Sequence, residues 1–200
     1  MENEAYSAGL MSESFWFLEF KQAVKLRSEG MTLEEIRDRC LADNLFGYTK
    51  ERRAKAVVGY VLSRIRLMDD AMVQLFMTSD LQTQKLINLI MLMRKDRLFF
   101  EFIYEVYREK IIMGQPEMEL ADAKVFFTRK ESQDADVAAW KDSTKKTLRS
   151  QFLRFMDEAN LLSVEGKKRM ITPPLIDIAL ERYLKANGEN DIVRALTGGQ

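Results

Sequence analysis

The amino-acid sequence predicts an all-α, globular, multi-helix protein with one short β-hairpin wing near its C-terminus. Glycine and proline are scarce, at 9 and 3 of 200 residues, so little interrupts a helix. Apolar residues recur at three- and four-residue spacings along most of the chain, and few segments alternate as strands do. With 46% hydrophobic and 31% charged residues, a chain of this length can bury a substantial core without disulfides or metal.

Three helices are expected in an N-terminal section, residues 1–68. The first spans about residues 14–28. The second begins at Thr32, where the motif TLEE places Glu35 for a capping box. The third and longest begins at Tyr48 or the residue after it. A helix, a turn, a short capped helix and a longer basic helix in this order indicate a helix-turn-helix element.

The third helix is expected to carry a basic face opposite an apolar face. A wheel of about 100° per residue gathers its apolar residues on one side: Ala54, Val57, Val58, Val61, Leu62, Ile65 and Met68. The segment 49–66 has six cations and one anion, a net charge of +5. The cations are Lys50, Arg52, Arg53, Lys55, Arg64 and Arg66, with Arg53 and Arg64 flanking the basic face. Most lie near the start of the helix, where recognition helices meet base edges and where helix amides favour phosphate.

The central section, residues 69–115, is expected to form the shared core. Its runs MVQLFM, LINLIMLM and LFFEFIYEVY concentrate the Met and aromatic residues, and stripes of this kind usually pack inside a protein. Ser79 and Gln82 of the motif SDLQ are expected to cap a helix within this section.

The last section, residues 116–200, is expected to form a second, winged helix-turn-helix-like unit. Short polar helices precede a long helix from Trp140, and a hairpin follows it with its turn at Gly166, because glycine supplies the positive φ of a tight turn. A final helix is expected over about 175–185. Residues 141–154 have five cations against one anion, a net charge of +4. The cations are Lys141, Lys145, Lys146, Arg149 and Arg154.

Several classes of catalytic site are excluded or disfavoured. The chain has no histidine, which removes Ser-His-Asp and Cys-His systems and histidine metal sites. It also lacks a GxxxxGK[ST] loop and a GxGxxG turn. The carboxylate pairs, such as Asp69 with Asp70, do not follow strands that would bring several together on a metal. We therefore expect no enzymatic activity, no metal and no cofactor.

The location is expected to be the reducing cytoplasm. Cys40 is the single cysteine and is interpreted as a small buried hydrophobe. The N-terminal stretch MENEAYSAGLMSES is acidic and lacks a basic region followed by an apolar one. The longest apolar region is interrupted by charged residues 94–97, short of the roughly 20 residues that span a membrane. No membrane contact is expected, and the protein is expected to be a monomer.

The charge is segregated along the sequence, as a DNA-facing surface requires. Lys and Arg total 31 and so do Asp and Glu, yet both predicted recognition helices and the wing are basic. The residues expected to contact DNA are Lys50, Arg52, Arg53, Lys55, Arg66, Lys145, Lys146, Arg149, Lys167, Lys168 and Arg169. Three alternatives remain open: packing helices with a solvated basic face, an adaptor that docks acidic protein partners, and a module that binds RNA.

Three stretches also resemble one known family. They are YSAGLMSESFWFLEF, GMTLEEIRDRCLADNLFGYTKERRAKAVVGYVLSRIRLM and AWKDSTKKTLRSQFLRFMDEANLL, in that order, within residues 6–162. The sequence is similar to BrxA, the small core protein of bacterial BREX phage-defence systems. The resemblance implies an all-helical fold with two helix-turn-helix elements, binding of double-stranded DNA and no activity as an enzyme. It also implies that the protein acts alongside other BREX defence proteins, among them a methyltransferase and an ATPase.

Overall fold

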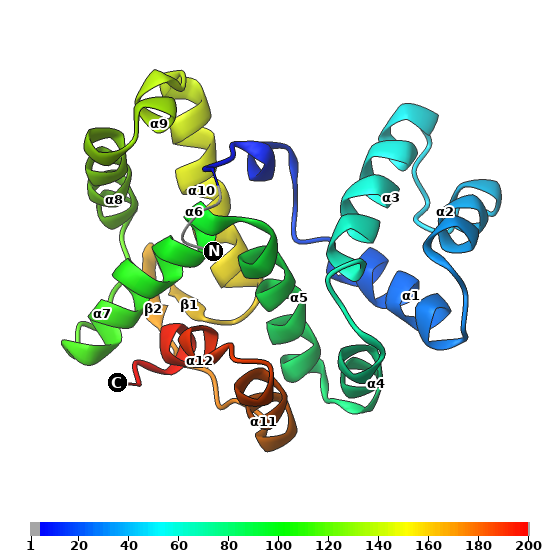
Figure 1. Ribbon diagram of the computed structural model, residues 1–200. Coiled ribbons are helices and arrows are strands. Elements are labelled where there is room, and N and C mark those ends of the chain that lie inside the picture. Colours follow the sequence, from blue (N-terminus) through cyan, green and yellow to red (C-terminus); the bar gives the residue numbers. More distant parts are fainter. Residues whose placement is uncertain (1–4, 200) are drawn as a thin grey trace. The chain divides into compact units, whose positions relative to one another are not determined.

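The computed structural model describes residues 5–199 and confirms the all-α fold class with a single short hairpin among those residues. The chain forms two compact units. The N-terminal unit is Phe15–Met91, and the C-terminal unit joins Met1–Ser14 to Leu92–Gln200. Figure 1 labels the α-helices and strands of both. The functional division at residues 68 and 115 expected from the sequence stays a prediction.

The N-terminal unit is built from α1 (Phe17–Ser28), α2 (Leu33–Ala42), α3 (Glu51–Ile65), α4 (Asp70–Thr78) and the first turns of α5 (Leu81–Lys95). Helices α1, α2 and α3 pack on one another in pairs, and α4 packs on α1. The whole expected apolar face of α3 is buried. This packing stabilises a helix whose own propensity is weakened by several valines.

Three helix starts show how local chemistry sets the boundaries. The capping box of α2 is confirmed: the Glu35 amide donates to Thr32 Oγ1 at 3.2 Å, and the Thr32 amide donates to the Glu35 carboxylate at 2.8 Å. Asp80, rather than Ser79, caps α5, because its carboxylate accepts from the Thr83 amide at 2.8 Å. Helix α1 begins after Trp16, whose left-handed backbone (φ 43°) is incompatible with a helix that starts at residue 14.

The C-terminal unit contains η1 (Gly9–Ser12), the end of α5, and a continuous helix made of α6 (Arg97–Phe102), the π-helical turn η2 (Ile103–Tyr107) and α7 (Arg108–Ile112). Next come α8 (Leu120–Gln133), α9 (Ala135–Ala139), α10 (Asp142–Glu158), β1 (Leu162–Glu165), β2 (Lys168–Ile171), α11 (Ile178–Ala186) and α12 (Asn190–Thr197). Helix α12 was not expected from the sequence. It is short, but its apolar residues pack on α7, η2 and α11.

An aromatic cluster fixes the helices of the C-terminal unit. Phe152 of α10 lies 4.9 Å from Phe99, 5.5 Å from Phe102 and 5.7 Å from Phe127, measured between ring centroids. Phe126 adds an edge-to-face contact with Phe102 at 5.3 Å. All five rings are fully buried. Aromatic pairs at these separations stabilise the fold by roughly 0.5–1.5 kcal/mol each beyond their buried area.

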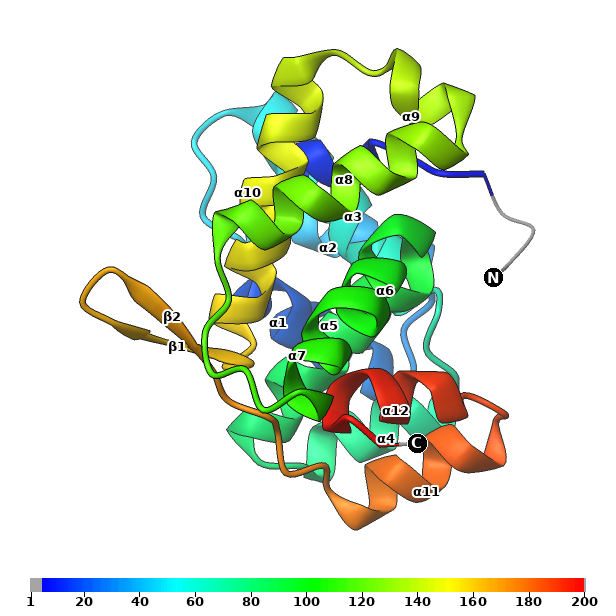
Figure 2. The same cartoon turned by 90° about the vertical axis from the view of Figure 1, so that its left-hand side faces the viewer.

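The predicted hairpin forms, and it projects from the C-terminal unit beyond the end of α10 (Figure 2). Its register pairs Leu162 with Ile171 and Glu165 with Lys168. A third segment joins its second strand, because Glu117 forms a β-bridge with Met170. The resulting chain order in this unit is helix, short extended segment, helices and hairpin.

One tyrosine holds both ends of the hairpin. Tyr107 is fully buried in η2, and its hydroxyl lies 3.4 Å from the Leu161 carbonyl oxygen and 3.2 Å from that of Thr172. These two residues come immediately before β1 and after β2. Burial raises the pKa of Tyr107, so its hydroxyl stays protonated and available as a donor. The hairpin is therefore fixed to the helical core at its base while its tip is exposed.

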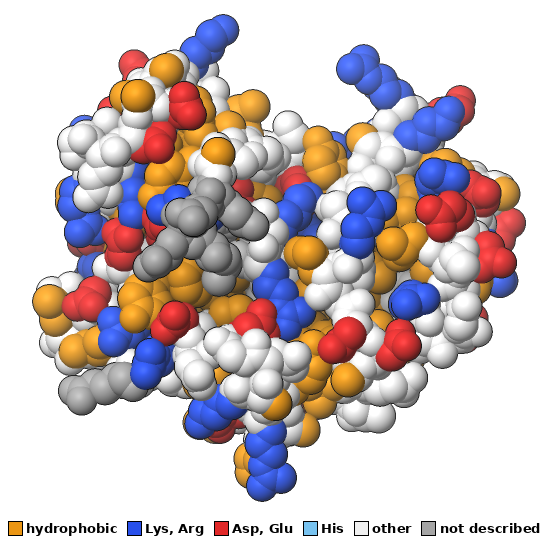
Figure 3. Space-filling model, viewed as in Figure 1, with side chains coloured by type: hydrophobic (Ala, Val, Ile, Leu, Met, Phe, Trp, Pro, Cys, Tyr) orange, Lys and Arg blue, Asp and Glu red, His pale blue; other side chains and the backbone are white. Residues whose placement is uncertain are grey.

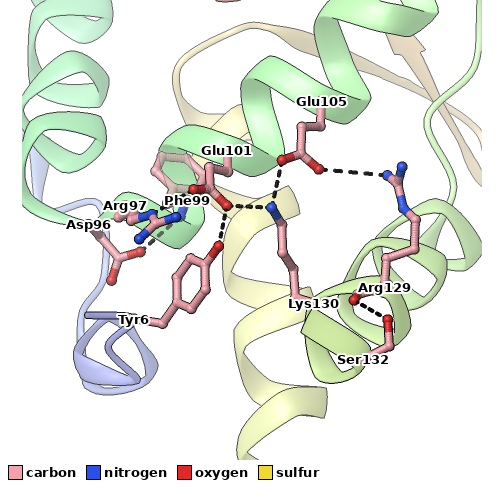
Figure 4. Close-up of polar contacts among 9 residues, drawn as sticks. All are labelled: Tyr6, Asp96, Arg97, Phe99, Glu101, Glu105, Arg129, Lys130 and Ser132. Atoms are coloured by element: carbon pink, nitrogen blue, oxygen red, sulfur yellow. Dashed lines mark hydrogen bonds and ion pairs between the residues drawn. The ribbon is translucent and has the colours of Figure 1, made fainter. Parts of the chain in front are cut away.

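A buried ion-pair network ties the N-terminal segment to the C-terminal unit (Figure 4). Lys130 of α8 is 4% exposed and donates to Glu101 and, at 2.6 Å, to Glu105. Glu101 also accepts from Arg97 and from the Tyr6 hydroxyl, each at 2.7 Å. Burial lowers the pKa of Lys130, but its bonds with the two glutamates outweigh this and raise it. Lys130 is thus a structural cation.

We expect Asp96→Asn to stabilise the protein at neutral pH. Asp96 is 4% exposed and accepts from the Phe99 amide at 2.8 Å, and burial raises its pKa from 3.8 to about 6. The folded state therefore disfavours the ionised carboxyl, so the free energy of unfolding falls as pH rises from about 4 to about 6. Asparagine keeps the acceptor and removes the charge, which predicts a gain of about 1–2 kcal/mol near pH 7.

Urea unfolding of the unmodified protein and of Asp96→Asn, at a series of pH values between about 4 and 8, measures the difference in free energy of unfolding. The series stops at about pH 4 because other carboxyls protonate below it. The gain should be small at the acidic end and largest above pH 6. An equal gain at every pH, or a loss at neutral pH, would contradict the role assigned to Asp96 ionisation.

Candidate nucleic-acid interface

The start of α3 presents most of the expected cations of the N-terminal unit to solvent. Lys50, Arg52, Arg53, Lys55 and Arg66 are all exposed. Figure 3 shows Lys and Arg side chains standing out from the surface over α3. Lys55 forms an ion pair with Glu51 one turn away, at 2.5 Å. Among the described residues, Lys50, Arg52 and Arg66 form no ion pair, so their charges are available to a ligand.

Arg64 does not belong to this surface, although the sequence placed it at the edge of the basic face. Its side chain is fully buried, and its Nη1 donates to the Phe15 carbonyl oxygen at 2.6 Å and to Asn88 Oδ1 at 3.3 Å. Asn88 Nδ2 donates to the same carbonyl at 2.8 Å. Arg64 is therefore a structural cation, and the charge that α3 exposes is one lower than the sequence count.

The rings of Trp16 and Tyr48 lie beside Arg53 of α3. Trp16 stacks on Tyr60 with ring centroids 5.5 Å apart. The guanidinium carbon of Arg53 lies 5.3 Å from the Trp16 ring centroid and 5.8 Å from that of Tyr48. The Tyr48 hydroxyl in turn donates to Glu19 at 2.8 Å. Trp16 is buried, and no pattern in the sequence indicates that its ring lies beside Arg53 of α3.

The basic face of α10 is smaller than the sequence indicated. Lys146 is exposed and Arg149 is half-buried, and neither forms an ion pair within the described part of the chain. Lys145, by contrast, is 6% exposed, and its ammonium lies 3.3 Å from Glu131 of α8 and 3.4 Å from the Ala138 carbonyl oxygen. Its charge is neutralised inside the unit. We therefore leave Lys145 out of the contact surface proposed below.

The wing carries three cations in different situations. Lys167 is exposed beside Gly166, whose φ of 65° makes the turn, and it forms no ion pair among the residues that the structure describes. Lys168 pairs with Glu117 at 2.9 Å, and this hydrogen bond raises the pKa of Lys168. Arg169 pairs with Asp157 of α10 at 3.0 Å. The tip therefore offers one free cation, while the other two fasten the wing.

The two basic helices also share an open N-terminus. Helix α3 begins after Lys50 and α10 after Lys141, and neither lysine side chain caps the helix. The first amides of a helix without a capping side chain remain available to solvent or to an anion. A lysine at this place adds positive charge where the helix dipole is already positive.

Two kinds of reactive site, a metal cluster and an ionised thiol, are absent from the described residues. They contain no group of three or more His, Cys, Asp or Glu side chains that could hold a metal ion. Cys40 is buried, and burial raises the pKa of its thiol to about 11, so it is protonated and unreactive at neutral pH. In the same range, no helix is long and apolar enough to cross a membrane.

Fold and surface together define a small helical protein with two basic helix faces and a β-wing. A family model described as BrxA matches residues 4–188. The BREX protein BrxA of Bacillus cereus (strain H3081.97) is 31% identical over 198 residues, covering 99% of both chains. The chain therefore belongs to the BrxA family. A crystal structure of an uncharacterized protein from Magnetospirillum magneticum shares the fold, with a TM-score of 0.81 at 18% identity over 98% of this chain and 100% of that one.

We expect the two arginines at the end of α3 to differ sharply in their contribution to stability. Arg64→Leu removes a buried donor from the Phe15 carbonyl and should cost about 2–4 kcal/mol. Arg66→Leu changes an exposed side chain and should cost less than about 0.5 kcal/mol. Thermal and urea unfolding compare them directly. Similar losses in the two variants would contradict the structural role given to Arg64.

Proposed function

We propose that the protein is a non-catalytic, double-stranded-DNA-binding component of a BREX bacteriophage-defence system. The observation that carries this proposal is the concentration of exposed, unpaired cations at the starts of α3 and α10 in a chain of zero net charge. Family membership supports the antiviral role, since the curated Bacillus cereus relative is named a BREX protein. The protein acts in the cytoplasm as a monomer, alongside other BREX proteins and without contact to a membrane.

Each unit supplies one contact element. In the N-terminal unit, α1, α2 and α3 form a helix-turn-helix element in which α3 is the recognition helix. In the C-terminal unit, α8, α9 and α10 precede the hairpin, and the bridge between Glu117 and Met170 gives the order of a winged helix. Both proposed recognition helices carry exposed cations near an N-terminus that no side chain caps, which is compatible with this assignment.

The contact residues follow from exposure and pairing. The main contacts are Lys50, Arg52, Arg53, Arg66, Lys146, Arg149 and Lys167. Lys55, Lys168 and Arg169 contribute where phosphate competes with their carboxylate partners, which lie 2.5–3.0 Å away. Because most of these side chains are long and mobile, they contact mainly the backbone phosphates, which position a protein on DNA without reading its sequence.

We expect binding to a random 30-base-pair duplex to be steeply salt-dependent. About 6–10 phosphate contacts release enough counterions to lower affinity by about 10³ or more between 50 and 200 mM salt. Fluorescence anisotropy across that range measures the slope. Affinity that hardly changes with salt would contradict an interface made of phosphate contacts.

Charge reversal should locate the interface. Arg52→Glu/Arg53→Glu removes two cations from the start of α3 and should weaken binding by about tenfold or more on every sequence. A matched control is Lys124→Glu/Arg182→Glu, which makes the same charge change at exposed positions of α8 and α11. The control should bind nearly as tightly as the unmodified protein.

The same variants distinguish a DNA-binding protein from an adaptor. If reversal at Arg52 and Arg53 leaves DNA retention unchanged but abolishes co-purification with other BREX proteins, the basic face binds an acidic partner and the DNA proposal fails. If an RNA duplex or single strand competes better than duplex DNA, the ligand is RNA. Retention lost in the α3 variant and kept in the control supports the proposal.

A further inference from the structure

Arg53 differs from the other exposed cations of α3 because its guanidinium is held in place. It lies over the rings of Trp16 and Tyr48, at 5.3 and 5.8 Å from their centroids. Arg52, its neighbour, has no such ring contact among the described residues. Contact with two ring faces restricts a guanidinium, while its N–H groups can still donate to a ligand. The Arg53 guanidinium donates no hydrogen bond to any other described residue, so its N–H groups are available to a ligand.

The ring platform is itself fixed by buried contacts. Trp16 adopts a left-handed backbone conformation, φ 43° and ψ 48°, which a bulky residue tolerates only where its surroundings enforce it. The peptide before it is held because the Phe15 carbonyl oxygen accepts from both Arg64 and Asn88. The ring of Tyr60, in α3, stacks on the Trp16 ring with an angle of 17° between the two ring planes. Tyr48 is fastened by its hydrogen bond to Glu19.

A fixed guanidinium is suited to a planar acceptor with two oxygens or nitrogens. Arg presents parallel N–H groups whose spacing matches a phosphate or the O6 and N7 atoms of guanine, whereas Lys presents a single mobile point charge. Arg53 is in the first turn of α3, the part of a recognition helix that meets base edges and the adjoining phosphates.

We propose that Arg53 is a DNA-contact residue whose ring-held guanidinium makes a two-point contact with duplex DNA. The remaining cations of α3 act as point charges. This inference rests on the proposed function and deepens it. Among the exposed cations of α3, Arg53 is the one at which DNA binding requires a guanidinium rather than any positive charge. Trp16 and Tyr48 contribute through Arg53 and do not contact the DNA themselves.

The test compares conservative replacements that keep the charge. Arg53→Lys and Arg52→Lys are measured in the full-length protein, by anisotropy on the random 30-base-pair duplex at one fixed salt concentration. Arg53→Lys should weaken binding by about tenfold, whereas Arg52→Lys should change it by less than about threefold. Tyr48→Leu, which removes one ring, should weaken binding with Arg53 intact. Tyr48→Phe, which keeps the ring but loses the hydrogen bond to Glu19, should weaken binding less than Tyr48→Leu does. Thermal unfolding confirms that each variant folds.

Selection of duplexes from a randomised pool identifies the acceptor. If Arg53→Lys abolishes a preference for guanine at one position, the contact is to a base edge. If Arg53→Lys weakens binding to all sequences alike, the contact is to phosphate. Either of these two results supports the two-point contact. Equal behaviour of Arg53→Lys and Arg52→Lys overturns the inference while the DNA proposal stands. Failure of the unmodified protein to bind any duplex at low salt overturns both.

Discussion

The N-terminal unit depends on one buried backbone oxygen. The Phe15 carbonyl accepts from Arg64 Nη1 at 2.6 Å and from Asn88 Nδ2 at 2.8 Å, so both of its lone pairs are used. These donors come from α3 and α5, and Phe15 precedes α1. A charge-assisted hydrogen bond in a dry interior is strong, and its loss leaves a costly unpaired group. The start of α1, the middle of α5 and the end of α3 are therefore held together, next to the left-handed backbone of Trp16.

The pattern of apolar residues predicted the helices well, because burial of one face and local capping act over three or four residues. The capping box at Thr32 and the glycine turn at Gly166 are local and were confirmed. Contacts between residues far apart in the sequence could not be predicted in this way. Arg64 and Arg66 look equivalent in the sequence, but the partners of Arg64 lie 49 and 24 positions away. Lys145 differs from Lys146 in the same way, through an ion pair with Glu131 on another helix.

This sorting of cations connects the fold to the proposed function. The cations that point inward, such as Lys130 and Arg64, have carboxylate or carbonyl acceptors at short distance, because a buried charge requires them. Most of the cations that point outward from the starts of α3 and α10 have no acid partner in the described residues, although Lys55 pairs with Glu51. A neutral chain thus presents locally positive surfaces, and these surfaces coincide with helix N-termini, where phosphate is favoured.

Hydrogen exchange of the full-length protein with and without a 30-base-pair duplex tests the central claim most directly, because it locates the bound surface without altering a residue. The account predicts new protection in peptides that cover the turn before α3 with its first helical turn, the start of α10 and the tip of the wing at Lys167. Protection confined to other elements, such as α11 or α12, or none at a duplex concentration that saturates binding, would contradict it.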